Sequence, residues 1–119
     1  MIQKNSMLRP VDNCGVIKTK VFHVYKGSNG RFALTGNFMK VSAREVQPEN
    51  AIKKKSKHVS VLIKSRYKNT RLDGSYVKFK KNSLVLLKKR LTPKGRSLKG
   101  PVSRNVNRKK FMSSFSKKI

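Results

Sequence analysis

Short runs of alternating apolar and polar residues predict that β-strands dominate the first 87 residues. Between residues 38 and 46, Met39, Val41 and Ala43 alternate with polar side chains, which is the two-residue period of a half-buried strand. Turn-forming sequences such as Gly27-Ser28-Asn29-Gly30 separate the runs. The strands expected on this basis cover residues 16–25, 31–35, 38–46, 59–64, 76–79 and 84–87. Several short strands joined by turns are typical of a β-barrel or a β-sandwich.

The pattern changes near the C-terminus, where apolar residues recur at intervals of four, as they do on one face of a helix. The two sets are Val102 with Val106, and Phe111 with Phe115 and Ile119. The interval of five between the sets breaks the helical phase. The sequence therefore predicts two short helices, the first beginning at Gly100-Pro101, because proline is tolerated in the first turn of a helix.

Positive charge is the dominant feature of the composition. The 119 residues, enough for one domain, include 31 Lys and Arg but only four Asp and Glu, which gives a net charge of +27. Residues 51–119 hold 23 of the basic residues and one acid, whereas residues 1–50 hold eight basic residues and three acids. Because such a charge opposes compaction, we expect the protein to bind a polyanion, and nucleic acid is the obvious one.

Three basic segments lie in predicted loops, where binding residues are commonly found. Their Lys side chains supply point charges and their Arg side chains supply forked donors, both of which suit phosphate oxygens. The residues predicted to bind RNA are Lys53, Lys54, Lys55 and Lys57; Lys64, Arg66, Tyr67, Lys68 and Arg71; Lys78; and Lys88, Lys89, Arg90, Lys94 and Arg96.

Two aromatic features have more than one interpretation. Tyr67 lies inside a basic run, where its ring could stack on an unpaired base or could pack onto the barrel. The stripe formed by Phe111, Phe115 and Ile119 is either core or a protein interface. By contrast, Asp73-Gly74 is expected to be a tight turn closed by an Asx-type hydrogen bond, and no catalytic acid is assigned there.

The composition argues against several other functions. The longest apolar run is the four residues 84–87, far below the roughly 18 needed to span a membrane. Neither His23 nor His58 has a partner acid or a second ligand at metal spacing, and the lone Cys14 has no clear activating base. We therefore expect no catalytic residue, no metal, no cofactor, no small-molecule substrate and no membrane association.

Val61-Leu62-Ile63 is followed after nine residues by Asp73-Gly74, and then by Phe79, Asn82 and Val85-Leu86. The spacing of these residues resembles the signature of the universal large-subunit ribosomal protein fourteen family. Further islands resemble the opening and closing segments of that family. These islands are Met1-Ile2-Gln3, Met7-Leu8 and Asp12-Asn13, and then Gly100-Pro101-Val102 with Arg104, Arg108 and Phe111.

The resemblance implies a fold, a function and a set of partners. The fold is mostly β, a closed five-stranded barrel with extended basic loops over residues 1–100 and a short helical part over residues 101–119, within one domain of residues 1–119. The function is a structural role in the large ribosomal subunit, with rRNA bound near the subunit interface. The partners are large-subunit rRNA, small-subunit rRNA across the interface and neighbouring proteins such as a homologue of the nineteenth large-subunit protein. The protein contacts are expected at Arg104, Arg108, Phe111, Met112 and Phe115.

Two further expectations concern rival functions and location. A cold-shock-like barrel or RNA chaperone outside the ribosome is the alternative function. Such proteins display aromatic residues on one strand face, whereas the aromatic residues of this chain are scattered.

The family-like opening begins at Met1, and Lys outnumbers Arg by 22 to nine alongside nine Asn, which an A/T-rich genome would produce. We therefore expect a mitochondrial ribosomal protein encoded in the organelle, with the bacterial cytoplasm or a plastid as the alternative.

Overall fold

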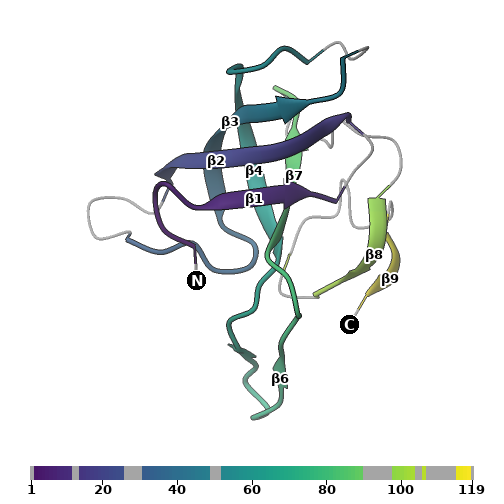
Figure 1. Ribbon diagram of the computed structural model, residues 1–119. Helices are drawn as coiled ribbons and strands as arrows, with labels where there is room; N and C mark the ends of the chain where they lie inside the picture. The colour runs from purple at the N-terminus through teal and green to yellow at the C-terminus, as the bar shows by residue number, and fades with distance from the viewer. Residues whose placement is uncertain are drawn as a thin grey trace.

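Five strands close into a barrel in the computed structural model, which describes residues 2–11, 14–25, 31–48, 52–89, 98–103, 106 and 115–118 (Figure 1). For residues 98–99 and 115–118 it describes the backbone only. The barrel strands are β1 (Met7–Pro10), β2 (Val16–Val24), β3 (Phe38–Val46), β4 (Lys57–Lys64) and β7 (Ser83–Leu87). Their order is β1-β2-β3-β4-β7, and β1 closes the barrel by pairing with β7.

All neighbouring strands of the barrel are antiparallel except β1 and β7, which run parallel, with Arg9 opposite Ser83. Antiparallel neighbours can be joined by short turns, whereas parallel neighbours need a longer connection. In this chain β2, β3 and β4 lie between β1 and β7 in the sequence and in the barrel. The closure therefore removes both open sheet edges without any crossover helix.

The barrel interior is filled by one face of each strand. Met39, Val41 and Ala43 are fully buried at alternating positions of β3, as their two-residue period predicts. They pack in one cluster with Leu62 of β4 and Leu86 of β7. Burial of this apolar face is the main stabilising contribution to the barrel.

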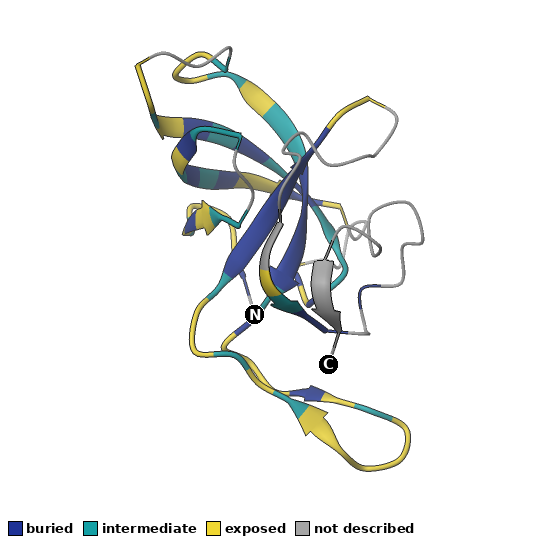
Figure 2. Cartoon of the chain, turned by 90° about the vertical axis from the view of Figure 1, so that its right-hand side faces the viewer, coloured by how far each residue is buried: buried dark blue, intermediate teal, exposed yellow. Residues whose placement is uncertain are grey.

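A second apolar cluster lies outside the barrel, on the opposite faces of β4 and β7. Val61 and Ile63 of β4 point away from Leu62 and pack with Val102 and Val106 near the C-terminus. Consequently residues 60–63 of β4 and all five residues of β7 are buried, on both faces of these strands, and dark blue strands cross the centre of Figure 2. This double burial explains why residues 61–63 and 84–87 read as continuous apolar runs.

The two short C-terminal helices are not confirmed, because the part of the chain that the structure describes contains no helix. The expected helix start at Gly100-Pro101 lies in β8 (Leu98–Val102), which pairs in parallel with β9 (Phe115–Lys118). Beyond β8, the N–H of Val106 donates to the carbonyl of Ser103 at 3.1 Å. Val102 at the end of β8 and Val106 lie in one cluster, as they would have done on a helix. The rest of the predicted helical segment, residues 104–105, 107–114 and 119, lies outside the described residues.

The predicted strands over residues 16–25, 59–64 and 84–87 are confirmed with slightly different limits, and one barrel strand was missed. The strand expected over residues 31–35 is wrong, because these residues form no strand and make an isolated bridge, in which Ala33 pairs with Ile2. The strand expected over residues 76–79 is reduced to β6 (Tyr76–Val77), which pairs with β5 (Asn69–Thr70). The missed strand is β1, whose four residues carry too short an apolar pattern to be recognised. The mostly β fold with a closed five-stranded barrel is confirmed.

Candidate nucleic-acid interface

The predicted RNA-binding residues that the structure describes form two groups at opposite ends of β4. Lys57 begins β4 and Lys64 ends it, so the two groups are roughly 23 Å apart at the usual rise of an extended chain. Near the Lys57 end lie the turn of residues 53–56 and, because Leu87 pairs with Val59, the exposed Lys88 and Lys89. Near the Lys64 end a basic ribbon, residues 64–82, extends away from the barrel (Figure 1).

The turn before β4 is held against β3 by hydrogen bonds. The N–H of Lys55 donates to the carbonyl of Ala43 at 2.6 Å, and the N–H of Ala43 donates to the carbonyl of Ser56 at 2.9 Å. The Ser56 hydroxyl closes the turn by donating to the carbonyl of Lys53 at 2.6 Å. The exposed side chains of Lys53, Lys54 and Lys55 therefore project from a fixed backbone, which favours anion binding because less conformational entropy is lost.

Hydrogen bonds join the two sides of the basic ribbon at its base, and a further hydrogen bond links the ribbon to the segment before β3. The N–H of Phe79 donates to the carbonyl of Ser65 at 3.0 Å, and the N–H of Arg66 donates to Asn82 Oδ1 at 2.8 Å. Deeper in the fold, Asn69 Nδ2 donates to Thr35 Oγ1 at 2.8 Å, and both residues are buried. The ribbon is thus an ordered arm, and its cationic side chains have a defined direction relative to the barrel.

The tip of the ribbon is the tight turn expected at Asp73-Gly74. Asp73 Oδ1 accepts from the N–H of Ser75 at 3.0 Å and from the Ser75 hydroxyl at 2.6 Å. The hydrogen bonds from Ser75 lower the pKa of the Asp73 carboxyl. Gly74 has a φ of +91°, a conformation that favours glycine. The Asx-type turn is confirmed, and its carboxylate is already occupied in holding the backbone.

Aromatic side chains line the basic ribbon on its solvent side. Tyr67 is 47% exposed, so its ring is not buried against the barrel. Tyr76 is also exposed, and Lys68 Nζ lies 4.1 Å from its ring centroid, within the range of a cation–π contact. Exposed rings next to cations can stack on unpaired bases, so base stacking by Tyr67 stays a prediction.

Lys64 occupies a less solvated position than most of the predicted cations that the structure describes. Its side chain is half-buried at the end of β4. Burial lowers the pKa of the Lys64 ammonium, and the positive charge of Lys81 lowers it further. A cation that is partly desolvated beside another cation is destabilised, and an anion placed between the two would relieve this cost.

A basic cluster at the junction of β1 and β7 was missed at the level of the sequence. Arg9, Lys80 and Lys81 join Arg66 around a cavity of about 290 Å³, which Asn82 also lines. Arg9 is distant in sequence from the other three, and the parallel pairing of Arg9 with Ser83 brings it to them. Only the runs of basic residues were visible in the sequence, and Lys80-Lys81 adjoins a predicted strand rather than a predicted loop.

Several predicted site residues lie outside the part of the structure that is described. Of the predicted RNA-binding residues these are Arg90, Lys94 and Arg96, and of the predicted protein-binding residues they are Arg104, Arg108, Phe111 and Met112. Phe115 belongs to β9, where the backbone alone is described. The remaining predicted cations are Arg71, which is half-buried in the ribbon, and Lys78, which is exposed just after β6.

Metal and membrane features were also sought in the described ranges. Within them, no three residues among His, Cys, Asp and Glu come together as a group that could hold a metal ion. Within the same ranges, no helix has the length and hydropathy that a membrane span requires.

The chain is similar to known ribosomal proteins. A family model described as ribosomal protein L14p/L23e matches residues 1–118. The sequence is also 46% identical, over 115 residues, to the large ribosomal subunit protein uL14m of Tetrahymena pyriformis, and this match covers 97% of both chains.

Proposed function

The chain belongs to the L14p/L23e family of ribosomal proteins, and from this premise we propose that it binds large-subunit rRNA through the two basic groups at the ends of β4. It is a structural component of the large subunit of the mitochondrial ribosome and is not an enzyme. Binding to rRNA is the part of this function that we infer from the arrangement of the cations.

The observation that carries the proposal is the ordered basic ribbon. It extends past the barrel, exposes Arg66, Lys68 and Lys78, and has its base fixed by the hydrogen bonds of Ser65 and Asn82. A narrow cationic arm can enter a groove or junction of folded RNA that the wider barrel cannot enter. Contacts of this kind bind phosphate oxygens and follow the shape of the RNA rather than its sequence.

The second basic group gives the barrel another contact roughly 23 Å away, at the Lys57 end of β4. Two separated phosphate-binding groups on one rigid barrel can bind two RNA segments at once. We propose that the protein in this way holds neighbouring rRNA segments together near the subunit interface. It would thereby support assembly and, together with small-subunit rRNA, inter-subunit bridging. Neighbouring large-subunit proteins, including a homologue of the nineteenth protein, are the proposed partners of the C-terminal segment.

The test is sedimentation of organelle lysate on sucrose gradients at low and then high salt, with detection of this chain. We expect the wild-type chain to sediment with the large subunit and with the assembled ribosome after a high-salt wash. A chain that stays at the top of the gradient at low salt would overturn the ribosomal role. Release at modest salt would overturn the proposal of an integral rRNA contact.

A pair of matched variants tests the ribbon itself. Replacing Arg66 and Lys78 with Gln removes two exposed cations from the ribbon, whereas replacing Lys4 and Arg31 with Gln removes two exposed cations elsewhere. We expect the ribbon variant to leave the subunit at lower salt, and the control to behave as wild type. For the purified chains on an rRNA transcript, each lost phosphate contact should reduce the log–log salt slope by roughly 0.7–0.9. Equal behaviour of the two variants would show that the ribbon is not a specific contact.

A further inference from the structure

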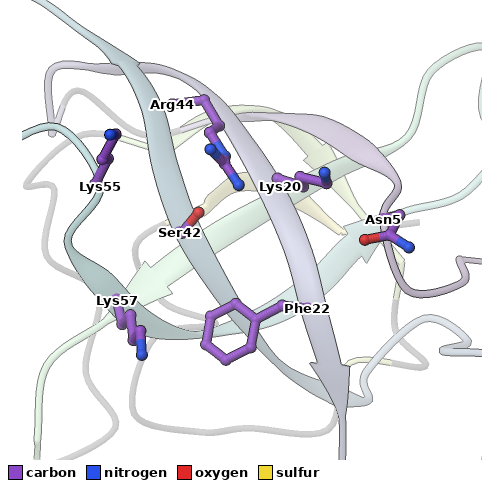
Figure 3. Close-up of a pocket in the computed structure, with 7 residues that line it drawn as sticks. All are labelled: Asn5, Lys20, Phe22, Ser42, Arg44, Lys55 and Lys57. Atoms are coloured by element: carbon purple, nitrogen blue, oxygen red, sulfur yellow. The ribbon is translucent and has the colours of Figure 1, made fainter.

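The outer face of β2 and β3 carries a cationic pocket in which two predicted RNA-binding residues, Lys55 and Lys57, meet Lys20 and Arg44, which the sequence did not indicate. Lys20, Arg44, Lys55 and Lys57 line a cavity of about 380 Å³ together with the ring of Phe22 (Figure 3). No acidic residue is among the described residues that line it. The volume falls within the range of small-molecule pockets.

The pairing register of the strands brings three polar residues of this pocket side by side. Lys20 of β2 pairs with Ser42 of β3, and Ser42 pairs with Lys57 of β4, so these three side chains form one row across the sheet. The adjacent row, Thr19 with Ala43, is buried in the barrel. Because side chains alternate between the faces of a sheet, the Lys20 row must face outward.

A β-bulge presents the aromatic ring. Val21 pairs with Val41 and His23 pairs with Lys40, so Phe22 is an extra residue in β2 and has no partner in the register. The bulge leaves both Phe22 and His23 exposed, whereas regular alternation would have exposed one of them and buried the other. Phe22 is 36% exposed, and Lys57 Nζ lies 5.7 Å from the centroid of its ring. A partly exposed aromatic side chain is therefore held next to cations.

Two residues with left-handed backbones complete the rim. Among the described residues other than glycine, Asn5 (φ 70°) and Lys55 (φ 67°) have positive φ, and both line this pocket. Hydrogen bonds hold each of them: Asn5 N donates to the Val21 carbonyl at 2.6 Å, and Lys55 N donates to the Ala43 carbonyl at 2.6 Å. Positive φ is unfavourable for a lysine, and such strain is concentrated at functional sites.

We infer that this pocket binds a single unstacked nucleotide of RNA, with its phosphate among the four cations and its base on the ring of Phe22. The inference rests on the proposed function, because rRNA is the source of the nucleotide. Cations alone would suit any anion, but an exposed ring within the cationic pocket adds a surface that a base can stack on. Lys57, which lies over the ring, can move onto the phosphate when a base takes its place. An acidic peptide could contact the cations but has no base that stacks on the ring. The lining therefore favours a nucleotide.

The test is an NMR titration of the full-length chain with adenosine 5′-monophosphate, with inorganic phosphate and with the trinucleotide ApApA at constant ionic strength. We expect saturable shifts of the amides of residues 5, 20–22, 42–44 and 55–57 with the nucleotide and with ApApA. Phe22→Leu should weaken nucleotide binding by roughly tenfold and leave phosphate binding unchanged, since it removes the stacking surface alone. Lys55→Asn, which still tolerates a left-handed backbone, should weaken both. Lys4→Met, next to the pocket rim but outside its lining, should change neither.

Several outcomes would overturn the inference. Shifts that fail to saturate and spread equally over Arg66 and Lys88 would show non-specific charge attraction. Unchanged nucleotide affinity in Phe22→Leu would remove the ring from the site. Binding of the monophosphate without ApApA would point to a free nucleotide as the ligand, and equal competition by hexaglutamate would point to an acidic protein segment.

The two proposals fail in different ways. A chain that sediments with the large subunit while Phe22→Leu binds the nucleotide as wild type does would refute the pocket alone. A chain that binds ApApA in this pocket but stays off the ribosome would refute the ribosomal contact alone.

Discussion

The ammonium nitrogen of Lys64 lies 2.7 Å from the point where a Cβ atom would be placed on Gly100. Lys64 is the last residue of β4 and Gly100 belongs to β8, so this approach joins the end of the barrel to the C-terminal strand pair. Gly100 also has a φ of +77°, which L side chains rarely adopt. The backbone conformation therefore favours a glycine at this position, whereas the flexible lysine side chain can move away from a new Cβ atom.

We expect Gly100→Ala to destabilise the protein by about 1–2 kcal/mol, which is the usual cost of a left-handed alanine. Backbone strain should dominate this effect, because the atom that a new Cβ would meet is the far end of a flexible lysine side chain. Urea denaturation of wild type and variant measures the change. A loss below about 0.3 kcal/mol would contradict the required backbone conformation.

A double-mutant cycle with Lys64→Ala separates strain from steric contact. If strain dominates, the two substitutions should be additive within about 0.5 kcal/mol. Rescue of Gly100→Ala by Lys64→Ala would instead show that the ammonium group blocks the side chain. The cycle is measured under the same denaturation conditions, so its four free energies are directly comparable.

The lowered pKa of Lys64 predicts a specific pH dependence of stability. Burial and the charge of Lys81 lower this pKa from its usual value of 10.5, so the unfolded chain binds the Lys64 proton more tightly than the folded chain does. Stability of the wild type should therefore increase as pH rises through the lowered pKa towards 10.5. Lys64→Met should be more stable than wild type at pH 7, and this difference should shrink over that window. Denaturation midpoints from pH 7 to pH 10.5 measure it.

The exposed Lys80 provides the control for this titration. Lys80→Met removes the same charge next to Lys81, without the burial that affects Lys64. The difference from wild type should shrink more for Lys64→Met than for Lys80→Met over the same pH range, because Lys64 is half-buried and Lys80 is exposed. An equal change for the two variants would mean that Lys64 is not desolvated in the free protein.

The strands of the barrel could be predicted from the sequence where their alternation was long. Residues 38–46 were predicted with the observed limits of β3, because nine residues give several repeats of the period. The four residues of β1 give too few repeats, and the pairing that closes the barrel is a contact between distant segments. At the C-terminus the interval of four between Val102 and Val106 predicted a helix. Val102 instead ends a strand, and the two side chains still lie in one cluster.

Only the part of the candidate site that consists of runs of basic residues could be predicted from the sequence. Runs such as residues 53–57 stand out in the sequence, and the structure places them in an exposed turn and at the start of β4. The Phe22 pocket depends instead on a bulge, on cross-strand register and on two left-handed residues. None of these leaves a pattern in one sequence, because each arises from pairing between segments that are far apart in the chain.

The hydrogen bond from Asn69 to Thr35 predicts how the basic ribbon is anchored. Both side chains are buried, so Asn69→Ala leaves the Thr35 hydroxyl without this donor, at a cost of about 1–3 kcal/mol. Hydrogen exchange should accelerate at Arg71 and Phe79, whose N–H groups donate within the ribbon, and should not change at Val21 in the barrel. Thr70→Ala, at the exposed neighbouring position of β5, is the matched control and should change neither. Uniform acceleration throughout the barrel would show that the ribbon and barrel unfold together.

Adjacent residues of β4 should have different effects on stability, because Leu62 faces the barrel interior and Ile63 faces the outer cluster. Leu62→Ala should destabilise the whole protein by about 2–5 kcal/mol, since it leaves a cavity among side chains from several strands. Ile63→Ala removes a contact surface of Val102 and Val106, so it should increase hydrogen exchange mainly in residues 98–106. Exchange measured by mass spectrometry on both variants distinguishes the two effects. If Ile63→Ala accelerates exchange in β2 and β3 as much as Leu62→Ala does, the outer cluster is part of the same cooperative unit as the barrel, and the barrel does not fold independently of the C-terminal strands.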